Sequence, residues 1–231
     1  MKRDLEVYLV RHGQTEFNAA ARLQGQADSP LTAAGAAAAY DLGVKLRREL
    51  PEPPFAAAFC STLARTRTTA QAILRGAGCP DLPIRELADL REYGFGRFEG
   101  LPAEVLYRHL SDLLGLPDTA TLLQRYRHGS SNLFAELLSR TEAGCETEAA
   151  FTDRLWRGMN HVAEHSPTQG RVLVVSHGMA IVALIKSLNT NDILYKSPPN
   201  VAVSRLHFDG TRWQIVEVAA PDTLSLIHIS E

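Results

Sequence analysis

Two histidines in this sequence each follow an apolar stretch and precede a glycine, which places them where side chains can do chemistry. Residues 7–13 read VYLVRHG, so Arg11 and His12 come at the end of a run typical of a buried strand. Residues 171–178 read RVLVVSHG and place His177 in the same way. A neutral imidazole can attack phosphorus without first losing a proton, and a guanidinium offers a fork of donors to an anion. The two strand ends therefore indicate phosphoryl or related anion chemistry.

A third cation, Arg65, follows a short apolar stretch at residues 55–60 and lies in the first turn of a helix predicted from Leu63 to about Gly76. The N-terminus of a helix attracts anions, which suits an arginine that binds the same anion. If the three strands are parallel, their carboxyl ends lie at one edge of the sheet, where ligands of open α/β sheets bind. The sequence therefore predicts that these side chains meet at that edge.

Strands and helices alternate along most of the chain, which predicts an α/β fold of three layers. The central sheet is expected to be mostly parallel, with helices on both faces. Thr32 is the predicted N-cap of a helix from Ala33 to about Leu50, and Asp209-Gly210 is a hairpin signal. Further strands are expected at 83–87, 201–208 and 213–218, and further helices at 146–165 and 179–188. Residues 17–25 and 90–100 are read as loops.

Residues 101 to about 141 are mostly helical and interrupt this alternation. They are too few for a core of their own, so we expect a small helical cap inserted into a single domain over residues 1–223. The last eight residues, 224–231, read LSLIHISE and resemble a translated transposase sequencing adapter. We expect them to be an adapter-derived tail with the natural C-terminus missing. The alternative is a short apolar tail packed on the sheet.

The composition favours an ordinary globular protein. With 231 residues, 45% of them hydrophobic, the chain can bury a full core. A net charge of −2 gives no basic footprint for nucleic acid, and no segment suggests a membrane partner or signal peptide. The three cysteines form no C-x-x-C pair, so a reduced, cytoplasmic compartment is expected. No feature of the sequence predicts an oligomeric state.

Beyond the two histidines and two arginines, an ordered set of motifs resembles the histidine phosphatase superfamily, which includes the cofactor-dependent phosphoglycerate mutases. From Val7 to Val218, apart from the insertion, the motifs are RHGQTEFN, RLQG, SPLT, STLARTRTTA, LREYGFGRFEG and VVSHG. The resemblance implies that His12 becomes a phosphohistidine and that Glu92 protonates the leaving group and then activates water. It also implies contacts to phosphoryl oxygens from a further set of residues: Arg11, Arg65, His177 and Asn18.

The resemblance further implies that Gln24 and Gly25 line the substrate pocket. Several of these residues have competitors nearby. Arg67 is as basic as Arg65, and Glu86, Asp89 and Glu99 compete with Glu92 for the role of acid. Motif position favours Arg65 and Glu92. No metal and no cofactor are expected, because the arginines supply the positive charge. A cysteine phosphatase is set aside because Thr66 stands where Cys60 would need an arginine.

We expect a phosphomonoesterase that acts on a small phosphorylated metabolite. Phosphoglycerate mutases carry a lysine after the glutamate loop and adjacent arginines in the insertion. Here residues 101–104 contain no lysine, and Tyr126 separates Arg125 from Arg127. Hydrolysis is therefore favoured over a mutase reaction, and a non-catalytic phosphate-binding domain is the second alternative. A sugar phosphate, phosphoserine and a nucleoside-like phosphate all stay open as substrates.

Overall fold

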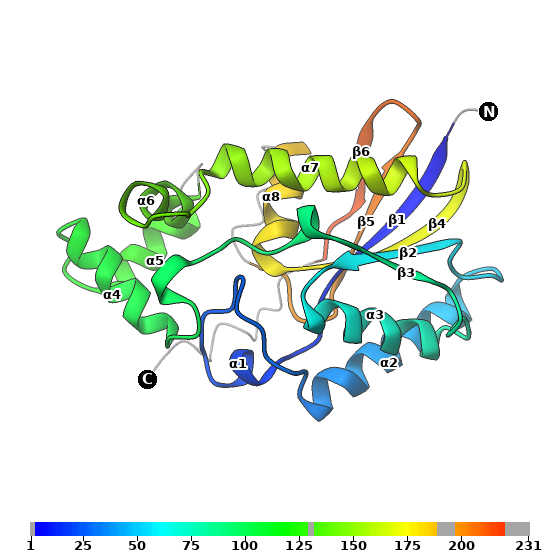
Figure 1. Ribbon diagram of the computed structural model, residues 1–231, viewed down its shortest axis with the longest axis horizontal. Coiled ribbons are helices and arrows are strands. Elements are labelled where there is room, and N and C mark those ends of the chain that lie inside the picture. The colour runs from blue at the N-terminus through cyan, green and yellow to red at the C-terminus, as the bar shows by residue number, and fades with distance from the viewer. Residues whose placement is uncertain (1–2, 129–131, 189–196, 220–231) are drawn as a thin grey trace.

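The computed structural model describes residues 3–128, 132–188 and 197–219, and a six-stranded sheet runs through its middle (Figure 1). The strand order is β3-β2-β4-β1-β5-β6. The strands are β1 (Asp4–Arg11), β2 (Ala57–Ser61), β3 (Ile84–Leu87), β4 (Gln169–Ser176), β5 (Val203–Phe208) and β6 (Trp213–Glu217). The first four are mutually parallel, and β5 and β6 are antiparallel to their neighbours. The predicted mostly parallel α/β fold is confirmed.

Helices cover both faces of the sheet (Figure 1). On one face lie α7 (Glu148–Glu164) and α8 (Gly178–Leu188), and on the other α2 (Ala33–Glu49) and α3 (Ala64–Gly76). Each face of the sheet has its own hydrophobic core. Along β1, the side chains of Leu5, Val7 and Leu9 belong to the core on the α7 and α8 face, whereas those of Tyr8 and Val10 belong to the core on the α2 and α3 face. Because successive side chains of a strand point to opposite faces, a strand buried on both sides reads as a continuous apolar run.

The parallel register brings the ends of three strands to one edge. Arg11 at the end of β1 lies opposite Ser176 at the end of β4, and Cys60 near the end of β2 lies opposite Val175. Immediately beyond, the backbone N–H of His12 donates to the Ser176 carbonyl at 3.0 Å. The residues that follow β1, β2 and β4 are therefore neighbours in space, as the alternating pattern predicts.

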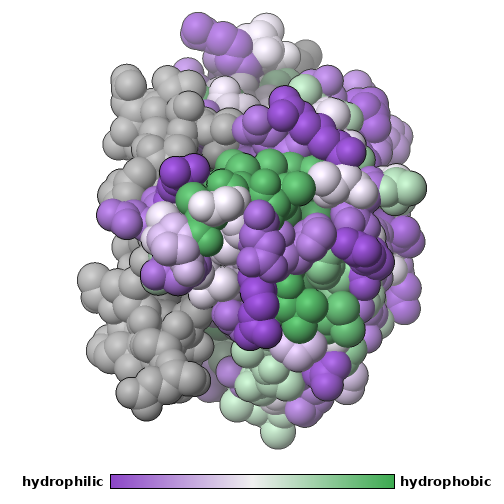
Figure 2. Space-filling model, turned by 90° about the vertical axis from the view of Figure 1, so that its left-hand side faces the viewer, coloured by the Kyte–Doolittle hydropathy of each residue, from purple (hydrophilic) through white to green (hydrophobic). Residues whose placement is uncertain are grey.

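Three helices interrupt the α/β order and lie beyond this edge: α4 (Ala103–Leu113), α5 (Thr119–His128) and α6 (Leu133–Thr141) (Figure 1). Their buried side chains, among them Leu106, Leu110 and Phe134, join the core on the α7 face. Viewed from this end, hydrophobic surface lies among hydrophilic side chains (Figure 2). The three helices thus pack on the α7 side of the main body, and their role as a cap stays a prediction.

The expectation that residues 17–25 are loop throughout was wrong at their start, where α1 (Glu16–Ala19) forms a single helical turn. Thr15 and Asn18 hold it by reciprocal side-chain to backbone bonds, a capping box. Four residues are too few for a helical period to be visible in the sequence. The predicted loop at residues 90–100, called the glycine-rich loop below for its glycines at 94, 96 and 100, follows the short turn η1 (Ala88–Leu90) and contains a second one, η2 (Gly96–Phe98).

Two further expectations concern the C-terminal tail and membrane-spanning helices. The suspect tail, residues 224–231, lies outside the described residues. Within the described ranges, no helix combines the length and the apolar character needed to cross a bilayer.

Candidate active site

His12 follows directly on β1 and is only 3% exposed. Its Nδ1 lies 2.8 Å from the carbonyl oxygen of Gly13, which can only accept, so Nδ1 carries the hydrogen and Nε2 keeps the lone pair. Burial, and next the charges of Arg11 and Arg65, hold the pKa of His12 well below its ordinary value. The ring is therefore neutral, with a nucleophilic nitrogen that makes no hydrogen bond within the described residues.

The turn after His12 is fixed by the helices beneath it. The backbone N–H of Gly13 donates to the Thr69 hydroxyl of α3 at 2.9 Å. A Cβ on Gly13 would lie 2.7 Å from the carbonyl oxygen of Gly35 in α2, a distance that side chains do not adopt. Glycine is thus required here for close approach, and α2 and α3 together orient the histidine.

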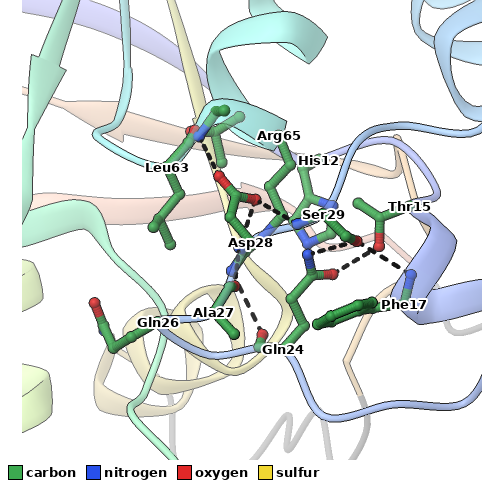
Figure 3. Close-up of polar contacts among 12 residues, drawn as sticks. His12, Thr15, Phe17, Gln24, Gln26, Ala27, Asp28, Ser29, Leu63 and Arg65 are labelled. Carbon is green, nitrogen blue, oxygen red and sulfur yellow. Dashed lines mark hydrogen bonds and ion pairs between the residues drawn. The ribbon is translucent and has the colours of Figure 1, made fainter. Parts of the chain in front are cut away.

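Arg65 lies in the first turn of α3 and is 1% exposed. Its Nη1 donates to the Ala27 carbonyl at 2.8 Å and to the Asp28 carboxylate at 3.0 Å, and its Nη2 donates to the Gly25 carbonyl at 2.7 Å (Figure 3). The other oxygen of Asp28 accepts the backbone N–H of Ala64, the first residue of α3, which has no partner within the helix. The loop before α2 thus grips the guanidinium: it accepts hydrogen bonds from Nη1 and Nη2, while Nε has no hydrogen-bond partner among the described residues.

His177 lies between β4 and α8 and is fully buried. Its ring meets the ring of His12 edge to face, with centroids 5.4 Å apart and planes at 62°. Nε2 of His177 lies 2.8 Å from the Ser61 hydroxyl, and burial, followed by the charge of Arg65, holds its pKa well below the ordinary value. The two imidazoles therefore share one site, and both are neutral.

Arg11 completes the group, with Nη1 donating to the Pro198 carbonyl at 2.6 Å. Among buried side-chain nitrogen and oxygen atoms of the described residues, three have no hydrogen-bond partner: Arg11 Nε, Arg65 Nε and His177 Nδ1. Buried polar groups are nearly always paired, so unpaired ones need an explanation. All three belong to this one site, and together they fit a ligand whose oxygens accept hydrogen bonds.

Glu92 lies in the glycine-rich loop and is 6% exposed. One carboxylate oxygen accepts the backbone N–H groups of Tyr93 (2.9 Å) and Ala180 (3.1 Å), and the other accepts that of Met179 (2.9 Å). The last two donors belong to the first turn of α8, directly after His177. Burial raises the pKa of Glu92, against the opposing effect of these hydrogen bonds and of the arginine charges.

The competing carboxylates have other partners. Glu86 forms a bidentate pair with Arg67, both contacts being 2.6 Å, and Asp89 lies 3.5 Å from Arg157. Arg67, the competitor of Arg65, therefore has its partner in Glu86, outside the site.

Glu99 joins two loops. It accepts four backbone N–H groups, at 2.8–3.0 Å, from Gly25, Gln26, Ala27 and Phe95. The first three belong to the loop that grips Arg65, and the fourth to the loop that carries Glu92. Its carboxylate is therefore a clamp between these loops, which the sequence does not reveal.

The Asn18 side chain is held through its amide oxygen. Its Oδ1 accepts from the backbone N–H of Thr15 and from the Asn200 side chain, each at 3.3 Å. Its Nδ2 makes no hydrogen bond to another described residue, so it is available as the donor that the family resemblance implies. Asn200 also donates to the His12 carbonyl at 2.9 Å and so links the two positions.

Gln24 and Gly25 have structural partners. The Gln24 amide accepts from the Thr15 hydroxyl at 2.6 Å and donates to the Ser29 hydroxyl at 3.0 Å (Figure 3). A Cβ on Gly25 would lie 2.0 Å from the Tyr93 carbonyl oxygen, so only glycine fits there. Both residues shape the loop that grips Arg65, and their contact with a substrate stays a prediction.

Several residues that hold the site were missed by sequence reasoning. Asp28 aims Arg65, Asn200 holds His12, and Ser61 holds His177. Arg154 of α7 donates to the Asp89 and Arg91 carbonyls at 3.0 Å and so fixes the segment of η1 that precedes Glu92. Only Ser61 lies inside a motif quoted above; the other three carry no local signal.

Comparisons with known proteins agree with this geometry. The family model described as "Histidine phosphatase superfamily (branch 1)" matches residues 7–221. A Bacillus subtilis protein named uncharacterized phosphatase PhoE is 29% identical over 211 residues, 90% of this chain and 91% of its own. The Citrobacter koseri probable phosphoglycerate mutase GpmB is 34% identical over 188 residues, 80% of this chain and 74% of its own.

Solved structures show the same fold. The crystal structure of a phosphoglycerate mutase from Bacillus anthracis has a TM-score of 0.85 at 26% identity and covers 94% of each chain. A mycobacterial glucosyl-3-phosphoglycerate phosphatase has a TM-score of 0.69 at 22% identity, with 94% of this chain and 99% of the other covered.

Proposed function

The chain belongs to the histidine phosphatase superfamily (branch 1), and on that premise we propose that it is a phosphomonoesterase that hydrolyses a small phosphorylated metabolite through a phosphohistidine at His12. The observation that supports this most directly is the group of three buried, unpaired nitrogens beside a neutral imidazole. A phosphoryl group in transfer spreads charge over three equatorial oxygens, which such donors stabilise.

In the first step, His12 Nε2 attacks phosphorus in line. The N–P bond forms as the bond from phosphorus to the leaving oxygen breaks. Arg11, Arg65 and His177 donate hydrogen bonds to the equatorial oxygens. Glu92, in its protonated form, gives its proton to the leaving oxygen, which departs as an alcohol.

In the second step, water attacks the phosphohistidine. The Glu92 carboxylate takes a proton from this water as the new O–P bond forms, the N–P bond breaks, and inorganic phosphate leaves a neutral His12. Burial favours the protonated form of Glu92, whereas the N–H groups of Tyr93, Met179 and Ala180 favour the carboxylate. These opposing effects suit a group that must take both forms in one cycle.

A cofactor-dependent phosphoglycerate mutase is the second candidate function. The 34% identity to GpmB and the likeness to the Bacillus anthracis structure favour it. Against it, residues 101–104 supply no lysine, and Arg125 on α5 is exposed. A purely phosphate-binding domain would have no need of an acid placed as Glu92 is.

The test is hydrolysis of p-nitrophenyl phosphate in excess chelator by the wild type and by His12→Ala. Loss of the nucleophile is expected to lower turnover by about a thousandfold or more, as for other covalent catalysts. Rapid acid-free quenching of wild type with labelled substrate should trap a phosphoenzyme that the variant lacks. His165→Ala, which removes an exposed histidine on the far end of α7, should keep wild-type turnover.

Sustained turnover by His12→Ala would overturn the nucleophile. Transfer that depends strictly on a bisphosphoglycerate primer, with negligible release of phosphate, would establish the mutase instead.

A further inference from the structure

Ser61 is the last residue of β2 and stands in the STLAR segment, where the proposed mechanism gives it no role. It is fully buried, and its hydroxyl oxygen lies 2.8 Å from Nε2 of His177. The two residues are 116 positions apart in the sequence. They meet because β2 and β4 are neighbouring parallel strands that end at the same edge.

The surroundings of Ser61 hold its oxygen in place. The backbone N–H of Leu63 donates to it at 3.3 Å, and the Thr66 hydroxyl lies 2.9 Å away. The Thr66 hydroxyl in turn lies 2.9 Å from the Ser61 carbonyl and 2.8 Å from the Leu63 carbonyl. The same turn leads into α3, which carries Arg65, so the serine is anchored to the frame of the phosphate site.

The hydrogen on the His177 ring can be assigned from this network. A neutral imidazole has one N–H and one acceptor nitrogen. If Nε2 carries the hydrogen, it donates to Ser61, and Nδ1 turns a lone pair toward the site. If Nδ1 carries it, Ser61 donates to Nε2, and the buried Nδ1–H has no partner among the described residues. Phosphoryl oxygens only accept, so of these two neutral forms a bound phosphoryl group selects the second.

We propose that Ser61 is a positioning residue for His177: its hydroxyl donates to Nε2 and thereby holds Nδ1–H toward the phosphoryl group. This inference rests on the proposed function, because the phosphoryl oxygens are what select that form of the ring. Partners that fix the tautomer and orientation of a histidine in this way are worth about 10- to 100-fold in function at metal sites, where the effect is best known.

The first test reads the ring directly. The wild type, labelled with ¹⁵N-histidine and saturated with inorganic phosphate at pH 8, is expected to show His177 with hydrogen on Nδ1 and a hydrogen-bonded acceptor at Nε2. His177→Asn assigns the signals. In Ser61→Ala the Nε2 resonance should move to that of an acceptor without a hydrogen bond. Hydrogen on Nε2 in the wild-type complex would overturn the proposal, whatever the fate of the variant.

The second test is a double-mutant cycle on hydrolysis. Ser61→Ala should lower kcat/KM by about 10- to 100-fold in the wild-type background and have little further effect in a His177→Ala background. Equal losses in both backgrounds would show that the serine acts on the fold rather than through His177. Inactive His12→Ala with fully active Ser61→Ala would reject this inference alone, whereas active His12→Ala would reject the proposed function.

Ser176→Ala is the matched control. Ser176 is also fully buried and adjoins His177, but its hydroxyl donates to the Leu90 carbonyl at 2.9 Å rather than to an imidazole. This variant should leave the His177 ¹⁵N signals in place while its unfolding midpoint reports the cost of losing a buried hydroxyl. A shift of the His177 signals as large as in Ser61→Ala would contradict a specific role for Ser61.

Discussion

At the scale of single residues, one physical cause sets both reactive groups. Burial disfavours charge, so it lowers the pKa of His12 and raises that of Glu92. The first change leaves a free lone pair for attack, and the second keeps a proton for the leaving group. When the environments of two titratable groups shift their pKa values in opposite directions, the directions indicate which group acts as base and which as acid.

These directions give a testable pH dependence. Protonation of His12 removes the nucleophile, so the acid limb of kcat/KM should lie well below pH 6.5, the ordinary pKa of histidine. Loss of the Glu92 proton removes the acid, so activity should fall as pH rises through a pKa above the ordinary 4.5. In Glu92→Gln this alkaline limb should vanish, and alkyl phosphates should lose about 10²- to 10⁴-fold while aryl phosphates lose less.

The measurement is kcat/KM against pH for both enzymes on the same two substrates, which cancels the ionisation of the substrates. Equal losses on alkyl and aryl phosphates, or an unchanged alkaline limb, would remove Glu92 from the role of acid.

The sequence is informative about residues at strand ends and much less so about their partners. His12 and His177 are predictable because each follows a buried strand and precedes a glycine. Asn200 is not, because its contact with His12 spans 188 positions and depends on how the chain returns after α8. Asp28 carries no signal for the same reason: its ion pair with Arg65 joins a loop to the first turn of α3, 37 positions further along the chain.

At the scale of elements, the first turns of helices and the loops position the side chains of the site. The first turn of α3 presents Arg65, and the first turn of α8 holds Glu92 by its N–H groups. Periodicity predicts these helices and their order, since each buries one apolar face. Periodicity does not predict which loops contact each other. A clamp such as Glu99 binds backbone N–H groups, and because nearly every residue has one, the sequence does not show which of them it binds.

Replacing Glu99 by glutamine tests that clamp. The amide nitrogen would face two of the four N–H donors, so Glu99→Gln should lose two hydrogen bonds and leave donors unpaired, at about 1–3 kcal/mol each. Because the loops carry both the Arg65 grip and Glu92, kcat/KM should fall along with the unfolding midpoint. Thermal unfolding and hydrolysis of p-nitrophenyl phosphate measure the two effects.

Glu104→Gln is the control, since Glu104 on α4 is exposed and its ion pair with Arg108 is 3.8 Å long. It should change neither quantity appreciably. If Glu99→Gln behaves like Glu104→Gln, the four N–H contacts do not hold the loops.

At the scale of the whole molecule, the fold gathers distant segments at one place. Two cores, one on each face of the sheet, fix the strands, and α4, α5 and α6 contribute side chains to one of these cores. The layers are predictable from alternation and from apolar runs. The placement of the three inserted helices is not, because the apolar faces of α4 and α6 fit many partners and only the complete fold selects one.

Burying two neutral imidazoles in this fold should make its stability depend on pH. For His12 and His177 the folded pKa lies below the unfolded one, so the unfolded chain binds protons first as pH falls below about 6.5. The free energy of unfolding should then fall, by up to about 1.4 kcal/mol per pH unit for each ring, until the folded pKa is reached. Glu92, whose folded pKa is raised, contributes with the opposite sign above its unfolded pKa.

Comparing variants with the wild type cancels Glu92 and every other group. In urea unfolding between pH 7.5 and 5, His12→Asn and His177→Asn should gain stability relative to the wild type as pH falls. His207→Asn should do the reverse, because His207 is hydrogen-bonded to Asp4 at 2.7 Å and its pKa is raised, so the wild-type contact stabilises at low pH and is lost as pH rises. Parallel curves for wild type, His12→Asn and His177→Asn would mean that the two rings are not held neutral, and the attack by His12 would then lack its free lone pair.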